Sequence, residues 1–309
     1  MMQRMQRGRK RALVLSGGGA RGLAHIGALQ EFEAAGIRFD LIVGCSFGGL
    51  IGAAYAQDPN AMRILQKFRD ALGDPRIARL NNSSLKDHYE VEKPGAFRKT
   101  LKTLRSWVML NYMAARQSVV SHELLEILLA RVLRPGDIRD TVIPYACNAT
   151  DLVHGEGFLF NEGDIQRALL ASMSVPGYFP PVAHQGRLLV DGAVTYNLPV
   201  RFARELGAEE VVAIDVHPKL HHMNSFSSIF DIIVRAKMIT GNILSREHLY
   251  SGDILIRPEV ADLHWYEFHH FDRIVAEGRR AAREVLNGQS QPSQPAAAPA
   301  ASLAAPSIA

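Results

Sequence analysis

The feature that most constrains this chain is the sequence Gly-Cys-Ser-Phe-Gly at residues 44–48. A short apolar run precedes it, and helix-like sequence follows at residues 50–56. In that context Gly-x-Ser-x-Gly forms a sharp strand-to-helix turn that exposes the serine at a helix N-terminus, where N–H groups favour negative charge. We therefore predict that Ser46 is a nucleophile and that Gly44 and Gly48 leave room for the neighbouring strand and helix. The alternative is a tight glycine turn with an incidental serine.

Composition limits the classes of protein to which this chain can belong. With 309 residues, 47% of them hydrophobic, it can bury one large α/β domain or two smaller ones. Two cysteines, Cys45 and Cys147, cannot build a disulfide framework, and we interpret both as core residues of a protein from a reducing compartment. The net charge of +4 is mild, and no basic and aromatic stripe indicates a nucleic-acid partner. No apolar run approaches the roughly 18 residues of a membrane span, and no signal peptide is evident. We expect a cytoplasmic protein that can associate peripherally with a membrane.

The order of expected elements predicts an α/β fold. A buried strand at residues 12–16, a helix at 23–35 and a second strand at 37–43 form a βαβ unit with a parallel strand pair. Strands and helices alternate again from residue 142. A parallel sheet with helices packed against it is the expected architecture.

Three regions follow from changes in composition. Residues 1–11 form a basic tail, residues 12–287 a single domain, and residues 288–309 a low-complexity tail of Pro, Ala, Ser and Gln that cannot form a core. Within the domain, residues 58–135 are expected to be a helical, cap-like region. Its basic amphipathic segment, residues 97–112, contains aromatic side chains and is a candidate membrane-contacting surface, with an ordinary solvated helix face as the alternative.

A glycine-rich loop follows the first strand. Its N–H groups, at the start of a helix, can bind an anion. The loop also matches the dinucleotide pattern Gly-x-Gly-x-x-Gly at Gly17, Gly19 and Gly22, with Asp40 about 20 residues on. That acid should end the second strand, however, whereas Asp40 begins it and the Ser46 turn occupies the strand end. We therefore disfavour a dinucleotide site.

The general base is less evident than the nucleophile. Asp191 ends a predicted strand and is followed by two small residues, so its carboxylate can approach Ser46 directly; a simple hairpin turn at Asp191-Gly192 is the alternative. In an α/β-hydrolase order, Asp191 or Asp215 would instead precede a histidine base. The histidines in that position are His217, His221, His222, His248, His264, His269 and His270.

Taken together, these motifs resemble the patatin-like phospholipase family. The blocks that carry the likeness are Gly17-Gly18-Gly19-Ala20-Arg21-Gly22, Gly44-Cys45-Ser46-Phe47-Gly48, Ala171-Ser172 with its following prolines, and Asp191-Gly192-Ala193 before Asn197-Leu198-Pro199. The likeness covers about residues 12–285. It implies a three-layer sandwich in which helices flank a mostly parallel central sheet.

The resemblance also implies the roles of individual residues. It implies a Ser–Asp dyad, with Ser46 as nucleophile and Asp191 as base, and an oxyanion hole at the backbone of Gly17, Gly18 and Gly19. No metal or cofactor is required. Supporting positions are Arg21, Gly22, Gly44, Gly48, Gly192 and Ala193, where Arg21 either orders the loop or contacts phosphate. This sequence departs from the usual pattern only at Ala193 and Cys45, and His25 becomes a packing residue rather than the base.

The resemblance finally implies hydrolysis of acyl esters in phospholipids or related lipids through an acyl-enzyme. The expected partner is a lipid or acyl-ester substrate, with a possible peripheral membrane surface. Two alternatives stay open: an esterase or acyltransferase with a histidine base, and a non-catalytic lipid-binding protein that keeps the fold. The intact Ser46 and Asp191 argue against the non-catalytic alternative.

Overall fold

The computed structural model describes residues 8–78, 120–217 and 253–288, with single positions between residues 232 and 243. The predicted membrane-contacting segment, residues 97–112, lies outside the described residues. Most of the basic tail and nearly all of the C-terminal tail also lie outside them. These three assignments stay predictions.

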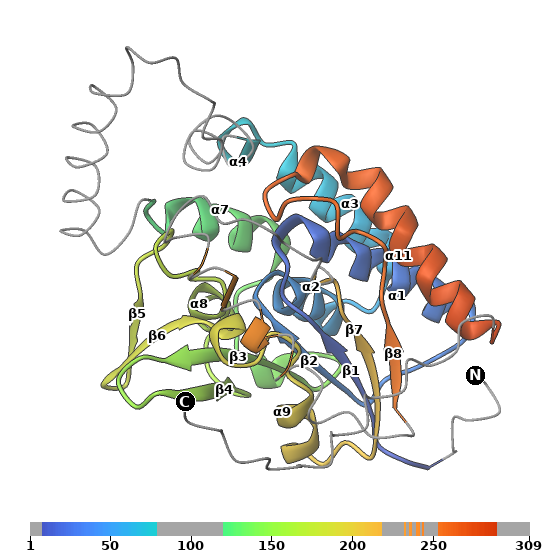
Figure 1. The fold of residues 1–309 in the computed structure, drawn as a ribbon, viewed down its shortest axis with the longest axis horizontal. Coiled ribbons are helices and arrows are strands. Elements are labelled where there is room, and N and C mark those ends of the chain that lie inside the picture. Colours follow the sequence, from blue (N-terminus) through green and yellow to red (C-terminus); the bar gives the residue numbers. More distant parts are fainter. Residues whose placement is uncertain are drawn as a thin grey trace, which may run out of the picture.

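A mixed eight-stranded sheet forms the centre of the described chain (Figure 1). The strand order is β5-β6-β3-β2-β1-β7-β8, and β4 also pairs with β3. The strands β3, β2, β1, β7 and β8 run parallel, whereas β4, β6 and β5 are antiparallel to their neighbours. Their bounds are β1 (Arg11–Leu15), β2 (Leu41–Cys45), β3 (Tyr145–Asp151), β4 (Glu156–Phe160), β5 (Val182–His184), β6 (Arg187–Asp191), β7 (Glu210–Ile214) and β8 (Ile254–Ile256). The expected α/β class with a mostly parallel sheet is confirmed.

Helices cover both faces of this sheet. Their bounds are η1 (Gly19–Leu23), α1 (Ala24–Ala34), α2 (Ser46–Gln57), α3 (Ala61–Leu72), α4 (Pro75–Ala78), α7 (Glu123–Val132), η3 (Ile138–Asp140), α8 (Ile165–Ser172), η4 (Gly192–Val194), α9 (Val200–Glu205), η5 (Phe268–His270) and α11 (Phe271–Leu286), where η marks a 3₁₀ turn. Successive side chains of a strand point to opposite faces, so β1 contributes Leu13 and Leu15 to the larger core and Ala12 and Val14 to the smaller one. The larger core includes α1, α2 and α11, and the smaller core includes α9.

The second strand begins later than expected. The sequence predicts a strand from residue 37, but β2 starts at Leu41. Gly36 adopts a positive φ of 68° after α1, and the Ile37 amide donates to the carbonyl of Phe32. The chain therefore uses these residues to end the helix before it enters the sheet, a common way of ending α-helices.

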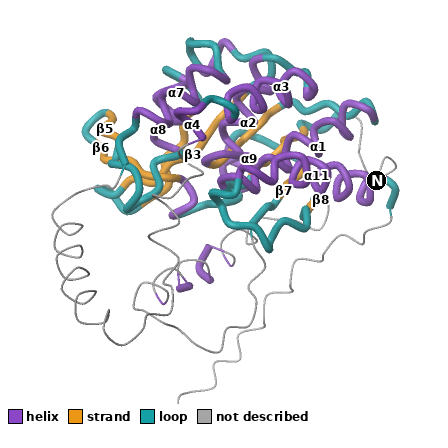
Figure 2. Tube along the Cα trace, turned by 90° about the horizontal axis from the view of Figure 1, so that it is seen from above, coloured by secondary structure: helices purple, strands orange, loops and turns teal. Residues whose placement is uncertain are grey.

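The last helix packs against the first. Helices α1 and α11 lie side by side (Figures 1 and 2). Two glycines, one on each helix, lie at the contact. A Cβ added at Gly278 would lie 1.8 Å from the carbonyl oxygen of Ala24, and one added at Gly27 would lie 2.0 Å from that of Val275. The backbones are therefore too close for any side chain at these two positions. Glu31 of α1 also forms ion pairs with Arg279 and Arg283 of α11.

We expect Gly278→Ala to destabilise the protein. Alanine gains about 1 kcal/mol of helix propensity over glycine, but overpacking costs about 1–3 kcal/mol, and here the added atom meets backbone that cannot rotate away. Because a contact of 1.8 Å with backbone places the overpacking cost at the upper end of that range, the net loss in unfolding free energy, measured by chemical denaturation, should be about 2 kcal/mol. The control is Ala276→Ser at an exposed position of the same helix, which should change stability by less than about 0.5 kcal/mol. Unchanged or increased stability of Gly278→Ala would show that the two helices separate at little cost.

Candidate active site

The turn between β2 and α2 holds Ser46 in an unusual backbone conformation. Ser46 has a φ of 51°, in the left-handed region that side chains other than glycine rarely adopt. Glycines make the turn possible: a Cβ added at Gly48 would lie 2.3 Å from the carbonyl oxygen of Ser16, and one added at Gly44 would lie 2.5 Å from the Cα of Gly49. The strand-turn-helix arrangement expected around Ser46 is present.

Asp191 lies beside this serine. The Ser46 Oγ donates a hydrogen bond of 2.7 Å to Oδ2 of Asp191. The sheet register explains the approach, since Cys45 at the end of β2 is level with Asn148 of β3, and the next residue of β3 pairs with Asp191 at the end of β6. Both side chains are nearly inaccessible, with 8% of Ser46 and 3% of Asp191 exposed. A direct bond of this length leaves no place for an imidazole between them.

Other groups fix the Asp191 carboxylate. Its Oδ1 accepts the amide of Ala193 at 2.8 Å, and the thiol of Cys45 lies 3.9 Å from the same oxygen. A Cβ added at Gly192 would lie 2.4 Å from the carbonyl oxygen of Asn148, so the turn after Asp191 requires glycine. The carboxylate is therefore oriented by its own turn before any substrate arrives.

Ser172 contacts Ser46 from another direction. The amide of Ser46 donates to the Oγ of Ser172 at 2.9 Å, and the Ser172 side chain is fully buried. In the sequence, Ser172 is part of a block that resembles the family, and no role is predicted for it. The Ala-Ser pair before a proline-rich loop was the available signal, but sequence spacing does not show which backbone amide a buried hydroxyl meets.

The glycine loop of residues 17–19 lies against Ser46. A Cβ added at Gly17 would lie 3.2 Å from the Cβ of Ser46. The amide of Gly17 is already used, because it donates to the carbonyl of Asn197 at 3.1 Å. The amides of Gly18 and Gly19 donate to no other group among the described residues. These two N–H groups therefore remain available to a ligand at the loop.

A segment distant in sequence holds the glycine loop in place. We call residues 263–270, which precede α11, the clasp. The carbonyl of Trp265 accepts the amide of Ala20 at 2.7 Å. Gly19 has a φ of 57°, and a Cβ there would lie 2.2 Å from the same carbonyl oxygen. The Trp265 ring meets Tyr178 edge-on at 5.0 Å, and Phe268 meets Phe47, the residue after the nucleophile, at 5.4 Å. The clasp was not predicted from the sequence.

Two basic residues near the loop have supporting contacts. The Nε of Arg21 donates to the carbonyl of Gly18 at 3.3 Å. Burial lowers the pKa of Arg21 to about 10, against the raising effect of the Asp215 charge, so the side chain stays positive at neutral pH. The Nε2 of His25 donates to the carbonyl of Ser16 at 2.9 Å, and burial lowers the pKa of His25 to about 4. His25 is therefore a neutral packing residue that points at backbone.

The remaining candidates among the described residues have other contacts than the Ser46–Asp191 hydrogen bond. Asp215, the alternative acid, accepts the Nε of Arg257 at 3.3 Å and the amide of His217 at 3.0 Å. Gly22 packs on Phe47, where a Cβ would lie 2.9 Å from the ring. His221, His222 and His248 lie outside the described residues. No described helix is both long and apolar enough to cross a membrane.

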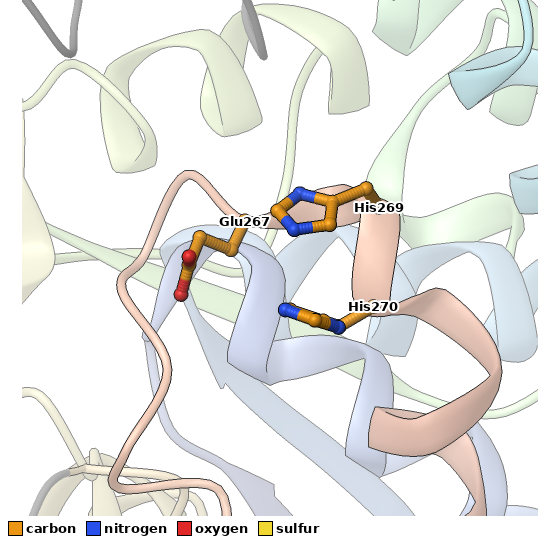
Figure 3. A group of neighbouring side chains, drawn as sticks. All are labelled: Glu267, His269 and His270. Atoms are coloured by element: carbon orange, nitrogen blue, oxygen red, sulfur yellow. The ribbon is translucent and has the colours of Figure 1, made fainter.

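One group of side chains in the described chain has the composition of a metal site. Glu267, His269 and His270 bring one candidate ligand atom each to within 4.8 Å of one another (Figure 3). All three belong to the clasp, and none contributes to the Ser46–Asp191 contact. The expectation that catalysis requires no metal is untested.

Comparisons with known proteins identify the family of this chain. A family model described as Patatin-like phospholipase matches residues 13–204. Patatin-like phospholipase domain-containing protein 6 of Mus musculus is 34% identical over 217 residues, which are 70% of this chain and 14% of the relative. Lysophospholipase NTE1 of Debaryomyces hansenii is 26% identical over 307 residues, which cover 90% of this chain and 18% of the relative. This chain therefore spans less than a fifth of the length of these relatives.

Two solved structures align with most of this chain at low sequence identity. VipD from Legionella pneumophila has a TM-score of 0.42 at 14% identity, covering 91% of this chain and 67% of that one. The type III effector ExoU has a TM-score of 0.38 at 16% identity, covering 91% of this chain and 53% of that one. The assignment to a family depends instead on the family-model match over residues 13–204: this chain belongs to the patatin-like phospholipase family.

Proposed function

We propose that this protein is a serine hydrolase that cleaves acyl esters of phospholipids or lysophospholipids through a Ser46–Asp191 dyad and an acyl-enzyme. The observation that carries the proposal is the 2.7 Å hydrogen bond between the two side chains at a strained, nearly buried turn. Acyl transfer needs a nucleophile, a base and donors for the oxyanion. The proposal is supported by the position of Ser46, Asp191 and the glycine loop, which all lie at or directly after strand ends at the same edge of the sheet.

In the first half of the reaction Ser46 becomes acylated. The Oγ attacks the ester carbonyl carbon as its proton moves to Oδ2 of Asp191, and the carbonyl oxygen becomes an oxyanion. The amides of Gly18 and Gly19 would donate to this oxygen, because the amide of Gly17 is held by Asn197. The tetrahedral intermediate then collapses: the ester C–O bond breaks, and the departing alcohol takes the proton from Asp191.

The second half returns the enzyme to its starting state. Asp191 takes a proton from water, the resulting hydroxide attacks the acyl carbon, and the oxyanion forms again at the same amides. Collapse releases the fatty acid and returns the proton to Oγ of Ser46. The oxyanion donors are worth about 3 kcal/mol each, and such a contribution is needed because a carboxylate is a weaker base than an imidazole.

The lipid substrate class is inferred from the family and its named relatives. Two of the similar proteins are named a patatin-like phospholipase domain protein and a lysophospholipase. A lysophospholipid is therefore the first substrate to test. No observation in the described residues favours a histidine base or a non-catalytic role over the dyad.

We expect Ser46→Ala and Asp191→Asn each to lower hydrolysis of a lysophospholipid by at least about 10³-fold, since two residues that act as a unit fail together. Wild-type protein should gain the mass of a fluorophosphonate probe at Ser46, detected by intact mass and peptide mapping. Ser121→Ala, at an exposed serine, is the matched control and should keep full activity and labelling. Turnover retained by Ser46→Ala would refute the mechanism.

The oxyanion assignment predicts a selective loss in Gly19→Ala. The added Cβ would displace the Trp265 carbonyl and strain a backbone with φ of 57°, so kcat should fall by about 10–10³-fold with a smaller change in KM. Gly36→Ala is the control, because Gly36 has a similar φ of 68° with open space around it. Both variants should lose some stability, but only Gly19→Ala should lose turnover. Equal turnover in the two variants would show that the glycine loop does not supply the oxyanion hole.

His25 should affect stability rather than catalysis. Its pKa is about 4 in the folded protein and about 6.5 when unfolded, so the unfolded state binds the extra proton between these values. Stability should therefore fall as pH drops from about 6.5 to about 4, by up to roughly 3 kcal/mol in total. In His25→Gln, the glutamine amide can still donate to the carbonyl of Ser16. This variant should not show the loss of stability that His25 causes between about pH 6.5 and pH 4, and it should keep most of its activity at pH 7. Parallel stability curves for the two proteins, or a loss of activity above about 100-fold, would contradict this assignment.

A further inference from the structure

The clasp carries three side chains whose chemistry the proposed hydrolysis does not use. Glu267, His269 and His270 lie in or directly before η5, the turn that leads into α11. The ring centroids of His269 and His270 are 4.1 Å apart, and Figure 3 shows Glu267 beside the two rings. His269 is exposed, and the other two are half-buried. Neither ring forms a hydrogen bond to another described residue, so both have nitrogens free to bind a ligand.

The donor set selects one class of ligand. Two imidazoles and one carboxylate suit Zn²⁺, Ni²⁺ or Cu²⁺, whereas Mg²⁺ and Ca²⁺ prefer oxygen donors alone. Ligand atoms around a tetrahedral ion at 2.0–2.2 Å lie roughly 3.4 Å apart. The three atoms here are within 4.8 Å of one another, so side-chain rotations at a partly exposed surface can close the set, with water completing the coordination.

Neighbouring groups support the same arrangement. Oε2 of Glu267 accepts the amide of His264 at 2.7 Å, which orients the carboxylate as hydrogen bonds orient ligating carboxylates in metal sites. The nearby cation Arg273 is paired with Asp262 at 2.6 Å, which offsets its repulsion of a bound ion.

The position of the group connects it to the glycine loop. Glu267 is two residues from Trp265, whose carbonyl accepts the amide of Ala20, and Phe268 within the same turn contacts Phe47. An ion that joins Glu267 to His269 and His270 would restrict this turn and, through it, the Trp265 carbonyl.

We propose that Glu267, His269 and His270 bind a transition-metal ion such as Zn²⁺ and that the bound ion holds the clasp against the glycine loop. The site goes beyond the proposed function, because the hydrolytic steps proposed for Ser46 and Asp191 do not use a metal ion. Binding and the hold on the loop are both measurable without substrate, so failure of either is distinguishable from failure of the hydrolase proposal.

Trp265 supplies a built-in probe of binding. The chain contains two tryptophans, at positions 107 and 265, so Trp107→Phe leaves only the one in the clasp. In that background Ni²⁺ should quench fluorescence saturably at one equivalent, and excess Zn²⁺ should restore it. Zn²⁺ should also raise Tm, because it binds the folded state. His269→Ala and Glu267→Gln should each weaken binding at least tenfold, whereas the control His264→Ala should not. Mg²⁺ and Ca²⁺ should have no effect.

Hydrogen exchange tests the second half of the proposal. Zn²⁺ should slow exchange of the Ala20 amide, followed in a peptide that spans residues 17–23, and the effect should vanish in His269→Ala. Quenching that does not saturate, or that survives both ligand substitutions, would mean an adventitious ion only and would overturn the site. Saturable binding with unchanged Ala20 exchange would overturn the hold on the glycine loop.

Discussion

The left-handed backbone at Ser46 is the constraint on which the rest of the site depends. A residue other than glycine in this conformation costs about 1–3 kcal/mol, which the surrounding structure must offset. The offset is visible in the contacts: Gly48 lies against the carbonyl of Ser16, and the hydroxyl of Ser172 accepts the Ser46 amide. Because these contacts come from β1 and α8 as well as from the turn itself, the serine is held from several sides.

The sheet brings the other groups to the same edge. The glycine loop follows β1 and the nucleophile follows β2, so both lie where adjacent parallel strands end. Asp191 is positioned by a different kind of strand: it lies at the end of β6, which pairs with β3 in the antiparallel direction. The dyad therefore needs β3 in place as a spacer, and its 2.7 Å contact reflects the register of three strands rather than local sequence.

Local sequence motifs predicted which residues lie in the turns of the site. They did not predict the distant residues whose hydrogen bonds keep those turns in place. Ser46, Asp191 and the glycines follow from motif order and from the requirement for small residues at tight turns. The hydrogen bond from Gly17 to Asn197 and the contact of Ala20 with Trp265 could not be predicted, because nothing in the local sequence of either partner specifies the other. The short β5 was missed for a related reason, since its three residues are defined by pairing with β6. The α/β class was predictable because the alternation of strands and helices is local.

The functional unit extends beyond the part of the chain that matches the family model. Residues 13–204 contain both members of the dyad and the glycine loop. Yet β1 is paired on its other side by β7, and the amide of Ser16 donates to the carbonyl of Ile214, both after the matched region. The clasp and α11 also follow it, and they hold Ala20 and α1. A fragment that ended at residue 204 would keep Ser46, Asp191 and the glycine loop but would expose one side of β1, and the glycine loop would lose its contact with Trp265. The later residues are therefore part of the structure that holds the candidate site, although they contribute none of its proposed reacting groups.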